Sequence, residues 1–294
     1  MSDLEGRFRR DYNRLDFPFT HQLAGNPLFD LDNLVEFTRR TPERRDHYWA
    51  NGAAPVNNAW SDGTIGRQSL PDTLVNVEHN NSTVVLRHTE RDPVFAPVLT
   101  SLVAAIIDLS GERMRADVRL GEVSILVGSP GRIPSYHMTA ATRFLVQITG
   151  DRQVQVFDPS DRTLVTDRAL EDFFAGGGHR EPLRTDRPDD RDTHDVRAGY
   201  GVHVPACAPH WIRYGDTVSV ALGVEFELRS VDRLAKLYRF NHGLRRLGLK
   251  PVPPNVSGWR DRIKLAAADG VAALRLAGKL GRGRRREART PPAG

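Results

Sequence analysis

Two histidines in strand-like surroundings are the residues of this sequence best suited to metal chemistry. His137 lies in the run IPSYHMTAATRFLVQITG, where period-two alternation places His137, Thr139 and Ala141 on one face of a strand. His210 follows the turn signal VPACAP and begins a later strand-like run. Imidazole suits iron, and a barrel that receives one histidine from each of two strands can build a metal site. The chain has ten histidines, so spacing alone also allows a structural role for this pair.

The segments that carry these histidines have the composition of short strands and hairpins. Residues 115–158 and 195–230 are rich in Val, Ile, Thr and Phe, and turn residues such as the Gly150-Asp151 pair divide them. The stretches between the predicted strands are too short for the crossover helices of a parallel sheet. The pattern therefore predicts a mainly β barrel with flanking helices.

The rest of the chain is predicted to be helical or irregular. We expect an N-terminal arm and helices over residues 1–112, packed on a barrel that spans 113–230. An insertion over 160–194 interrupts the barrel; RALEDFFAGGG predicts a short helix, and EPLRTDRPDDRDTHD predicts a loop. Residues 231–278 are predicted to be C-terminal helices, which offer a route to a homodimer.

Within the arm, the sequence predicts irregular structure with two helices. One ends near Arg40, before Pro42, and the other runs from about Pro93 to Leu109, before Gly111.

The positive charge of the chain is concentrated at its C-terminus. The net charge is +5, and the last sixteen residues, 279–294, contain six basic residues and one acid, so residues 1–278 sum to zero. This Gly-, Pro- and Arg-rich segment is predicted to be a disordered tail. It suits a solubilising role or weak electrostatic contact with nucleic acid.

Several classes of protein are disfavoured by composition. There is no apolar run close to the eighteen residues that a membrane span needs, and the charged N-terminus lacks the apolar core of a secretion signal. A single cysteine, Cys207, excludes an internal disulfide framework and a cysteine-based zinc site. We therefore expect a cytoplasmic protein.

Two stretches resemble the metal-binding segments of a known family. IPSYHMTAATRFLVQITGDRQVQVFDP is similar to the first such segment of bacterial cupin-like JmjC proteins, near the asparaginyl-hydroxylase branch, whose pattern is Thr-Pro-x-His-x-Asp followed by Asn-Phe-x-x-Gln-x-x-Gly-x-Lys. GYGVHVPACAPHWIRYGDTVSVALGVEFEL resembles the second segment, with its Pro-x-x-x-x-His motif. The resemblance covers roughly residues 15–265 in outline. It implies a double-stranded β-helix (the cupin/JmjC jelly roll) and an Fe(II)- and 2-oxoglutarate-dependent oxygenase.

The resemblance implies roles for four residues that match the family motifs. His137 corresponds to the first metal ligand and His210 to the last. Arg152 falls where the family has the lysine that pairs with the distal carboxylate of 2-oxoglutarate, and a guanidinium can accept that carboxylate bidentately. Gln147 matches the family glutamine that lines the pocket. An exposed charge in a hairpin turn is the alternative for Arg152.

Three positions depart from the family pattern. The metal-binding aspartate of the family is Thr139 here, and a neutral hydroxyl is a poor ligand for a divalent cation. Two pocket asparagines of the family align with Arg143 and Glu225. Charges of opposite sign in a buried pocket must be paired or bound by a ligand.

These departures leave three accounts of the site open. In the first, Glu225 supplies the missing carboxylate and a three-ligand metal site survives. In the second, a halide or water takes the open position, as in oxygenase-like halogenases, although Thr139 is bulkier than the residue found there. In the third, Glu225 and Arg143 form an ion pair that replaces the metal.

The leading interpretation is an Fe(II)- and 2-oxoglutarate-dependent hydroxylase, or a close variant, that acts on an unknown small molecule or peptide. The alternative is a non-catalytic cupin-like binding or regulatory protein that has lost its metal-binding triad.

Overall fold

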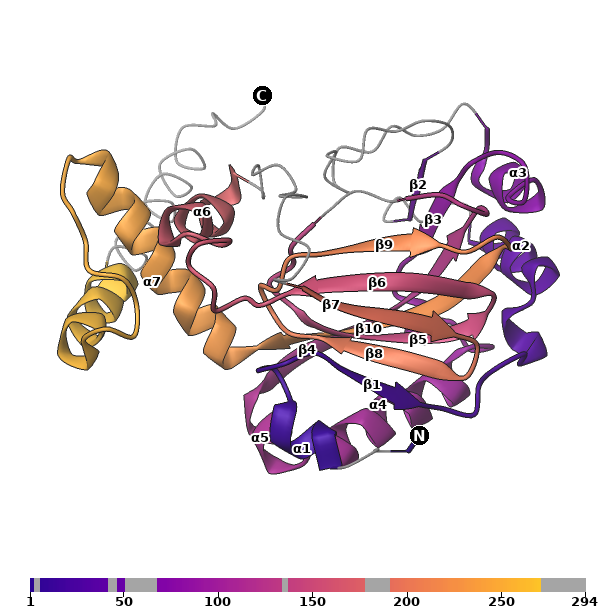
Figure 1. The fold of residues 1–294 in the computed structure, drawn as a ribbon, viewed down its shortest axis with the longest axis horizontal. Helices are drawn as coiled ribbons and strands as arrows, with labels where there is room; N and C mark the ends of the chain where they lie inside the picture. Colours follow the sequence, from indigo (N-terminus) through magenta and orange to yellow (C-terminus); the bar gives the residue numbers. More distant parts are fainter. Residues whose placement is uncertain (3–5, 42–46, 51–67, 134–136, 178–190, 271–294) are drawn as a thin grey trace, which may run out of the picture. The chain divides into compact units, whose positions relative to one another are not determined.

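The computed structural model describes residues 1–2, 6–41, 47–50, 68–133, 137–177 and 191–270 (Figure 1). The chain divides into two compact units. Unit 1 comprises Met1–Val165 and His179–Val231, and unit 2 comprises Thr166–Gly178 and Asp232–Gly294. None of the helices in the described ranges is both long and apolar enough to span a membrane.

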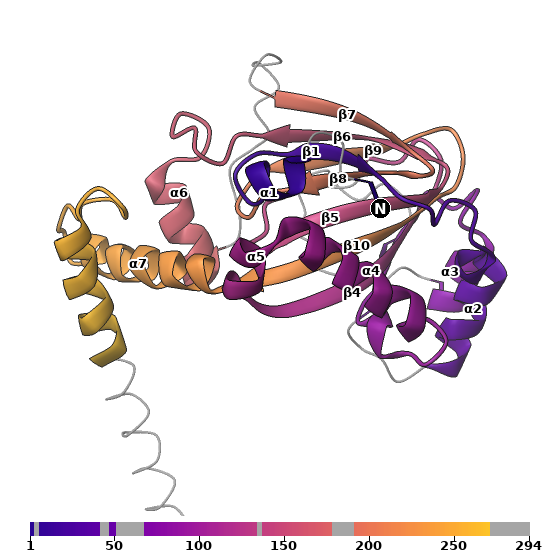
Figure 2. The same ribbon diagram turned by 90° about the horizontal axis from the view of Figure 1, so that it is seen from below.

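Unit 1 is built on two antiparallel sheets that face each other (Figures 1 and 2). The chain changes sheet between β5 and β6, between β7 and β8, between β8 and β9, and between β9 and β10, which is the winding of a double-stranded β-helix. The predicted mainly β jelly roll is therefore confirmed. In spatial order the larger sheet contains β1 (Phe17–Thr20), β8 (Tyr200–Val204), β5 (Thr142–Thr149), β10 (Ser219–Leu228), β4 (Val118–Gly128), β3 (Thr83–Leu86) and β2 (Tyr48–Ala50), and the smaller contains β7 (Arg191–Arg197), β6 (Asp151–Phe157) and β9 (His210–Tyr214).

Strand β10 holds the larger sheet together. It pairs with β4 on one side and with β5 on the other along most of its length. The β5 register shifts between Val220 and Ala221, whose partners are Thr149 and Gln147. This irregularity sets which side chains of β5 and β10 meet on the inner face.

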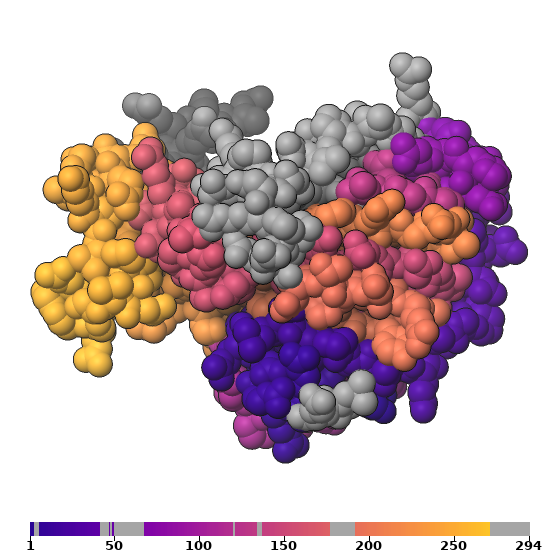
Figure 3. All heavy atoms as spheres, viewed as in Figure 1, coloured from indigo at the N-terminus to yellow at the C-terminus, as the bar shows by residue number. Residues whose placement is uncertain are grey.

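The barrel interior is an apolar core with polar residues among its walls. Alternate residues of both sheets point inward, as the period of a strand requires. Part of the outer face of the smaller sheet lies at the surface in the space-filling view, in pink and orange (Figure 3). The inward apolar side chains are Val85, Leu126, Leu145, Val154, Val156, Val196, Val202, Val204, Ala208, Ile212 and Tyr214.

The other face of the larger sheet carries an aromatic cluster. The Phe8 ring stacks on Phe144 at 5.6 Å, and His203 stacks on Phe17 at 4.7 Å. Helices α1 (Arg7–Asp11) and α4 (Ala96–Ser110) lie beside this face (Figure 2). The cluster gives unit 1 a second core outside the barrel.

The N-terminal region contains strands that the sequence analysis did not predict. We expected residues 1–112 to be an arm with helices, but β1, β2 and β3 extend the larger sheet at both edges. In β1, Phe17 and Phe19 point to the same buried side, and all four residues of β3 are buried. Runs this short lack the length that makes alternation recognisable in a sequence.

The predicted helices of this region are confirmed. The helix that ends near Arg40 is α2 (Leu31–Arg40), and the helix expected from about Pro93 is α4. The structure adds α3 (Leu70–Val75), α5 (Glu112–Asp117) and the short 3-10 helices η2 (Pro27–Phe29) and η3 (Thr89–Arg91).

The insertion was predicted correctly only in its first half. RALEDFFAGGG contains α6 (Asp167–Asp172) and the π-helical segment η4 (Phe173–Gly177). Residues 191–195, predicted as a loop, instead begin β7, because their backbone pairs with β6 from Phe157 back to Gln153. Residues 178–190 lie outside the described residues.

Unit 2 contains α6, η4, most of α7 (Arg229–Arg246) and a helix over residues 258–270. Buried Glu171 accepts hydrogen bonds from Nε and Nη2 of Arg245, at 2.7 and 2.9 Å. Several apolar side chains of this unit are exposed, among them Trp259 and Ile263. The homodimer through these helices stays a prediction, and the predicted tail over 279–294 lies outside the described residues.

Gly201 on β8 provides a test of the packing between β1 and β5. A Cβ atom at this position lies 2.3 Å from the Phe19 ring and 2.5 Å from the Leu145 carbonyl oxygen. We expect Gly201→Ala to lower the free energy of unfolding by about 1–3 kcal/mol because a backbone carbonyl cannot yield. Urea denaturation measures the effect. Gly223→Ala on β10, where the nearest atom lies at 3.4 Å, is the control and should change stability little; equal effects of the two would contradict the packing described.

His203 provides a test of burial in the aromatic cluster. Burial lowers its pKa to about 4, although the Leu15 carbonyl, Asp16 and Asp11 favour the charged ring. Because the pKa falls from about 6.5 on folding, the neutral ring stabilises the fold above pH 6.5. This stability is lost as the pH falls toward 4, by at most about 1.4 kcal/mol per pH unit. Titration followed by NMR should show the His203 ring uncharged at pH 5. A His203 midpoint near 6.5 would contradict its burial.

Candidate functional site

The structure brings the two predicted histidines together. His137 and His210 form an isolated antiparallel bridge, in which each backbone N–H donates to the other carbonyl, at 3.1 and 3.0 Å. Their rings lie 4.1 Å apart between centroids, inclined at 61°. The bridge places His137 beside the first residue of β9, so both imidazoles belong to the smaller-sheet wall of the barrel.

His210 presents one unoccupied nitrogen inside the barrel. Its Nδ1 lies 2.9 Å from the carbonyl oxygen of Ala208, and since a carbonyl only accepts, Nδ1 carries the proton. Burial lowers the pKa of His210 to about 3, and the positive charge of Arg143 acts in the same direction. The ring is therefore neutral near pH 7. Its buried Nε2 has a lone pair and no hydrogen-bond partner.

Arg143 links the histidines to the larger sheet. It lies on β5 opposite Glu225 of β10, and its Nη2 donates to the Glu225 carboxylate. Its Nη1 lies 3.3 Å from Nε2 of His137. A guanidinium has donors only, so His137 accepts this bond through the lone pair that a metal would need.

The metal-binding set implied by the family resemblance does not fit this arrangement. In the described ranges, no three His, Cys, Asp or Glu side chains lie close enough together to hold a metal. The Glu225 carboxylate and the His137 lone pair both bind the Arg143 guanidinium. Of the three accounts, this geometry corresponds to the ion pair of Arg143 and Glu225. The metal-ligand roles of His137 and His210 stay predictions.

Arg152 lies farther along the barrel on β6 and is fully buried. Its Nη2 donates to Oγ of Ser219 at 2.9 Å, and its guanidinium carbon lies 5.0 Å from the centroid of the Tyr214 ring. Nε and Nη1 have no hydrogen-bond partner. Gln147 donates to the same Ser219 oxygen at 2.8 Å, and its Oε1 is also without a partner. The exposed-turn alternative for Arg152 is therefore wrong.

Among the described residues, no acidic side chain pairs with the charged guanidinium of Arg152. Burial lowers its pKa; Tyr214 opposes the shift, and the charge of Arg143 adds to it. Arginine nevertheless stays protonated in proteins. A buried and unpaired cation is costly, so this end of the barrel is suited to an anion with hydrogen-bond acceptors. The donor set fits the carboxylate of 2-oxoglutarate.

The described contacts of Thr139 are with Ala141 and Cys207. Its hydroxyl donates to the Ala141 carbonyl at 3.1 Å, and its own carbonyl accepts from the backbone N–H of Cys207. The catalytic role predicted for Thr139 stays a prediction, and none of these contacts supports it.

Ser219 and Tyr214, which both contact Arg152, were not among the predicted site residues. Ser219 lies six residues before Glu225 on β10, so period-two alternation places both on one face. That signal was present in the sequence. Tyr214 packs over Gly128, where a Cβ atom would lie 2.3 Å from the ring, and this contact depends on the approach of the two sheets.

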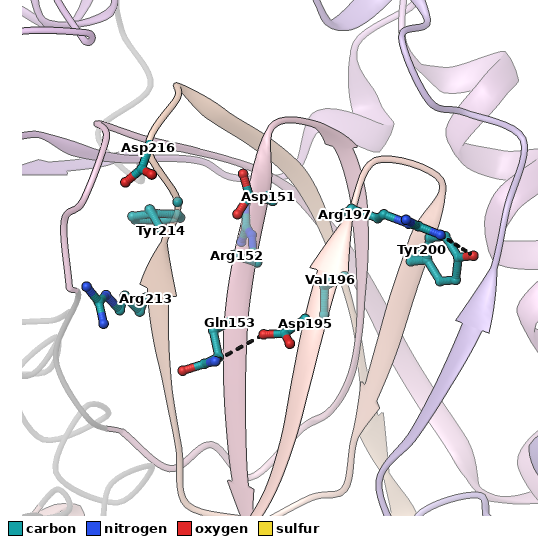
Figure 4. Close-up of a pocket in the computed structure, with 11 residues that line it drawn as sticks. Asp151, Arg152, Gln153, Asp195, Val196, Arg197, Tyr200, Arg213, Tyr214 and Asp216 are labelled. Atoms are coloured by element: carbon teal, nitrogen blue, oxygen red, sulfur yellow. Dashed lines mark hydrogen bonds between the residues drawn. The ribbon is translucent and has the colours of Figure 1, made fainter.

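A hollow of about 540 Å³ lies at the end of β6, β7 and β9, away from the histidines (Figure 4). Gln153 donates to Asp195 across it, and Arg197 donates to Tyr200 at its edge. Arg152 and Tyr214 are among the residues that line this hollow, so it lies beside the Arg152 guanidinium.

No protein-family model matches the chain, and no curated protein matches it. Solved structures do show similarity. The ribosomal oxygenase YcfD of Escherichia coli is 12% identical over 91% of this chain and 66% of its own length, with a TM-score of 0.48. Oxalate decarboxylase of Bacillus subtilis is 20% identical over 37% of this chain and 22% of its own, with a TM-score of 0.26.

A conserved protein of unknown function from Streptococcus pyogenes is 12% identical over 37% of this chain and 66% of its own length, with a TM-score of 0.24. The chain thus spans less than two thirds of the length of these proteins, and far less for the decarboxylase. The chain's own strand order is that of a cupin/JmjC-like double-stranded β-helix.

Proposed function

We propose that this chain is a cupin-like barrel that binds a small organic carboxylate, of the class of 2-oxoglutarate, through Arg152 and without iron. The observation that carries the proposal is the fully buried Arg152 guanidinium, two of whose nitrogens find no hydrogen-bond partner, and whose charge finds no acidic partner, among the described residues. A carboxylate supplies both the missing charge and the missing acceptors.

The groups around Arg152 favour a ligand with further polar atoms. The Oε1 atom of Gln147 accepts a hydrogen bond from a hydroxyl or a protonated acid. Nε2 of His210 is a second unpartnered acceptor. On β6, Val156 is the partner of His210, and it lies four residues from Arg152, or roughly 14 Å at about 3.4 Å per residue. Val154 of the apolar core lies between them on the same face of the strand.

In this proposal the two imidazoles do not carry redox chemistry. His137 is held by Arg143, and the neutral His210 ring offers a lone pair in a site remote from solvent. The activity is then ligand binding, in a regulatory or sensory role.

The second candidate is the Fe(II)- and 2-oxoglutarate-dependent oxygenase. The short distance of 4.1 Å between the ring centroids of His137 and His210 favours it, as does the unpartnered Nε2 atom of His210. Bound iron would supply oxygen activation, and the residues available to hold it are the two histidines. This candidate requires Arg143 to leave His137.

The Arg152 proposal predicts carboxylate binding that depends on one guanidinium. Isothermal titration of the wild-type chain with 2-oxoglutarate, in the presence of a chelator, should give binding. Arg152→Met should weaken it at least roughly tenfold, because a charge-assisted pair is lost. Arg91→Met, which removes an exposed arginine that does not line the hollow, is the matched control and should bind like the wild type.

The same titration separates the two candidates. Binding that appears only when Fe(II) is added under anaerobic conditions, with a visible charge-transfer band, would support the oxygenase and contradict the iron-free proposal. Absence of binding under both conditions would contradict both.

Arg152 also makes a prediction about stability. Without ligand, Arg152→Met should raise the free energy of unfolding by about 1 kcal/mol or more, because an uncompensated buried charge is replaced by an apolar side chain of similar length. Saturating 2-oxoglutarate should stabilise only the wild type. Urea denaturation measures both effects. A ligand-free variant less stable than the wild type would show that the protein compensates this charge by itself.

A further inference from the structure

A second arginine of the barrel, Arg143, holds the atoms that a metal site would use. Its Nη1 lies 3.3 Å from Nε2 of His137, and its Nη2 donates to the carboxylate of Glu225. One planar group therefore bridges an imidazole of the smaller-sheet wall and a carboxylate of the larger sheet. The third nitrogen, Nε, is buried and has no partner.

The groups around this guanidinium are of the types that bind divalent transition metals. An imidazole lone pair, a carboxylate and the unpartnered Nε2 of His210 make two nitrogen donors and one oxygen donor. With Arg143 between them, the described side chains do not come close enough together to form a metal site. The donors are present, and a protein cation separates them.

Arg143 is fixed in this position by the sheet. Its backbone on β5 is paired with Glu225 of β10 on one side and with Val204 of β8 on the other. Its side chain is 8% exposed, and that of Glu225 is 24% exposed. Displacing the guanidinium would leave the Glu225 charge unpaired in a poorly solvated place, which is unfavourable.

We infer that the guanidinium of Arg143 is the resident cation of this barrel, standing between His137 and Glu225 in place of a divalent metal. It neutralises the carboxylate, occupies the His137 lone pair and repels a second cation. Arg143 thereby prevents a metal from binding to this site, and its removal allows a metal to bind. The inference does not depend on carboxylate binding at Arg152.

Removal of Arg143 should unmask metal binding. We would titrate the full chain and Arg143→Asn with Co(II), following visible absorbance and binding heat, after checking both folds by circular dichroism. The variant should bind Co(II) at least about tenfold more tightly than the wild type, with a visible spectrum of nitrogen coordination. Adding His210→Ala should abolish the gain, and adding Glu225→Gln should reduce it.

Arg143→Lys is the matched control, because it keeps a positive charge at the same place and should stay closed to Co(II). A folded Arg143→Asn variant that binds Co(II) no more tightly than the wild type would overturn the inference.

A measurement on the wild type covers the case in which the variant does not fold. Co(II) should cause no paramagnetic shift of the His137 and His210 ring signals in the NMR spectrum. Shifted signals would show that metal reaches the histidines past Arg143 and would overturn the inference. These titrations contain no 2-oxoglutarate. A negative result would therefore contradict the inference about Arg143 but not the proposed carboxylate binding at Arg152.

Discussion

The pairing of β10 with both β4 and β5 is the contact on which the rest of the barrel depends. It forms the centre of the larger sheet and fixes which inward side chains stand opposite one another. Glu225 faces Arg143 near one end of this strand, and Ser219 at its other end meets Gln147 and Arg152. A slip of one residue would send these polar groups to the aromatic side of the sheet and bring apolar side chains inside.

Inside such a barrel, a charge has to be balanced by the wall or by a ligand. The two inward arginines of β5 and β6 show the two solutions. The charge of Arg143 is balanced by the Glu225 carboxylate, and its Nη1 also contacts a histidine lone pair. Arg152 meets a hydroxyl and an aromatic face, and neither carries a compensating charge. The charge of Arg143 is thus paired within the barrel, whereas that of Arg152 is left for a ligand. This difference is the basis of the proposed ligand binding.

Much of the barrel could be predicted from the sequence, because strand composition and turn residues are local properties. The meeting of His137 and His210 followed from two such runs and from the family resemblance. The short strands β1 and β3 could not be recognised, since three or four residues carry no clear period. The ion pair of Arg143 with Glu225 was one of three accounts that the sequence left open, whereas the contact of Arg143 with His137 could not be predicted. That contact depends on how the segment of His137 pairs with β9, which cannot be derived from residue types.

The position of β1 has a consequence for any shortened form of this chain. Phe17–Thr20 is the outermost strand beside β8, and Phe17 and Phe19 bury their rings against the aromatic cluster. A form that starts after Thr20 would leave the backbone N–H and C=O groups of β8 unpaired next to exposed phenyl rings. Such an edge recruits strands from neighbouring molecules. Proteolytic trimming at the amino terminus would therefore threaten solubility before it affected the histidines.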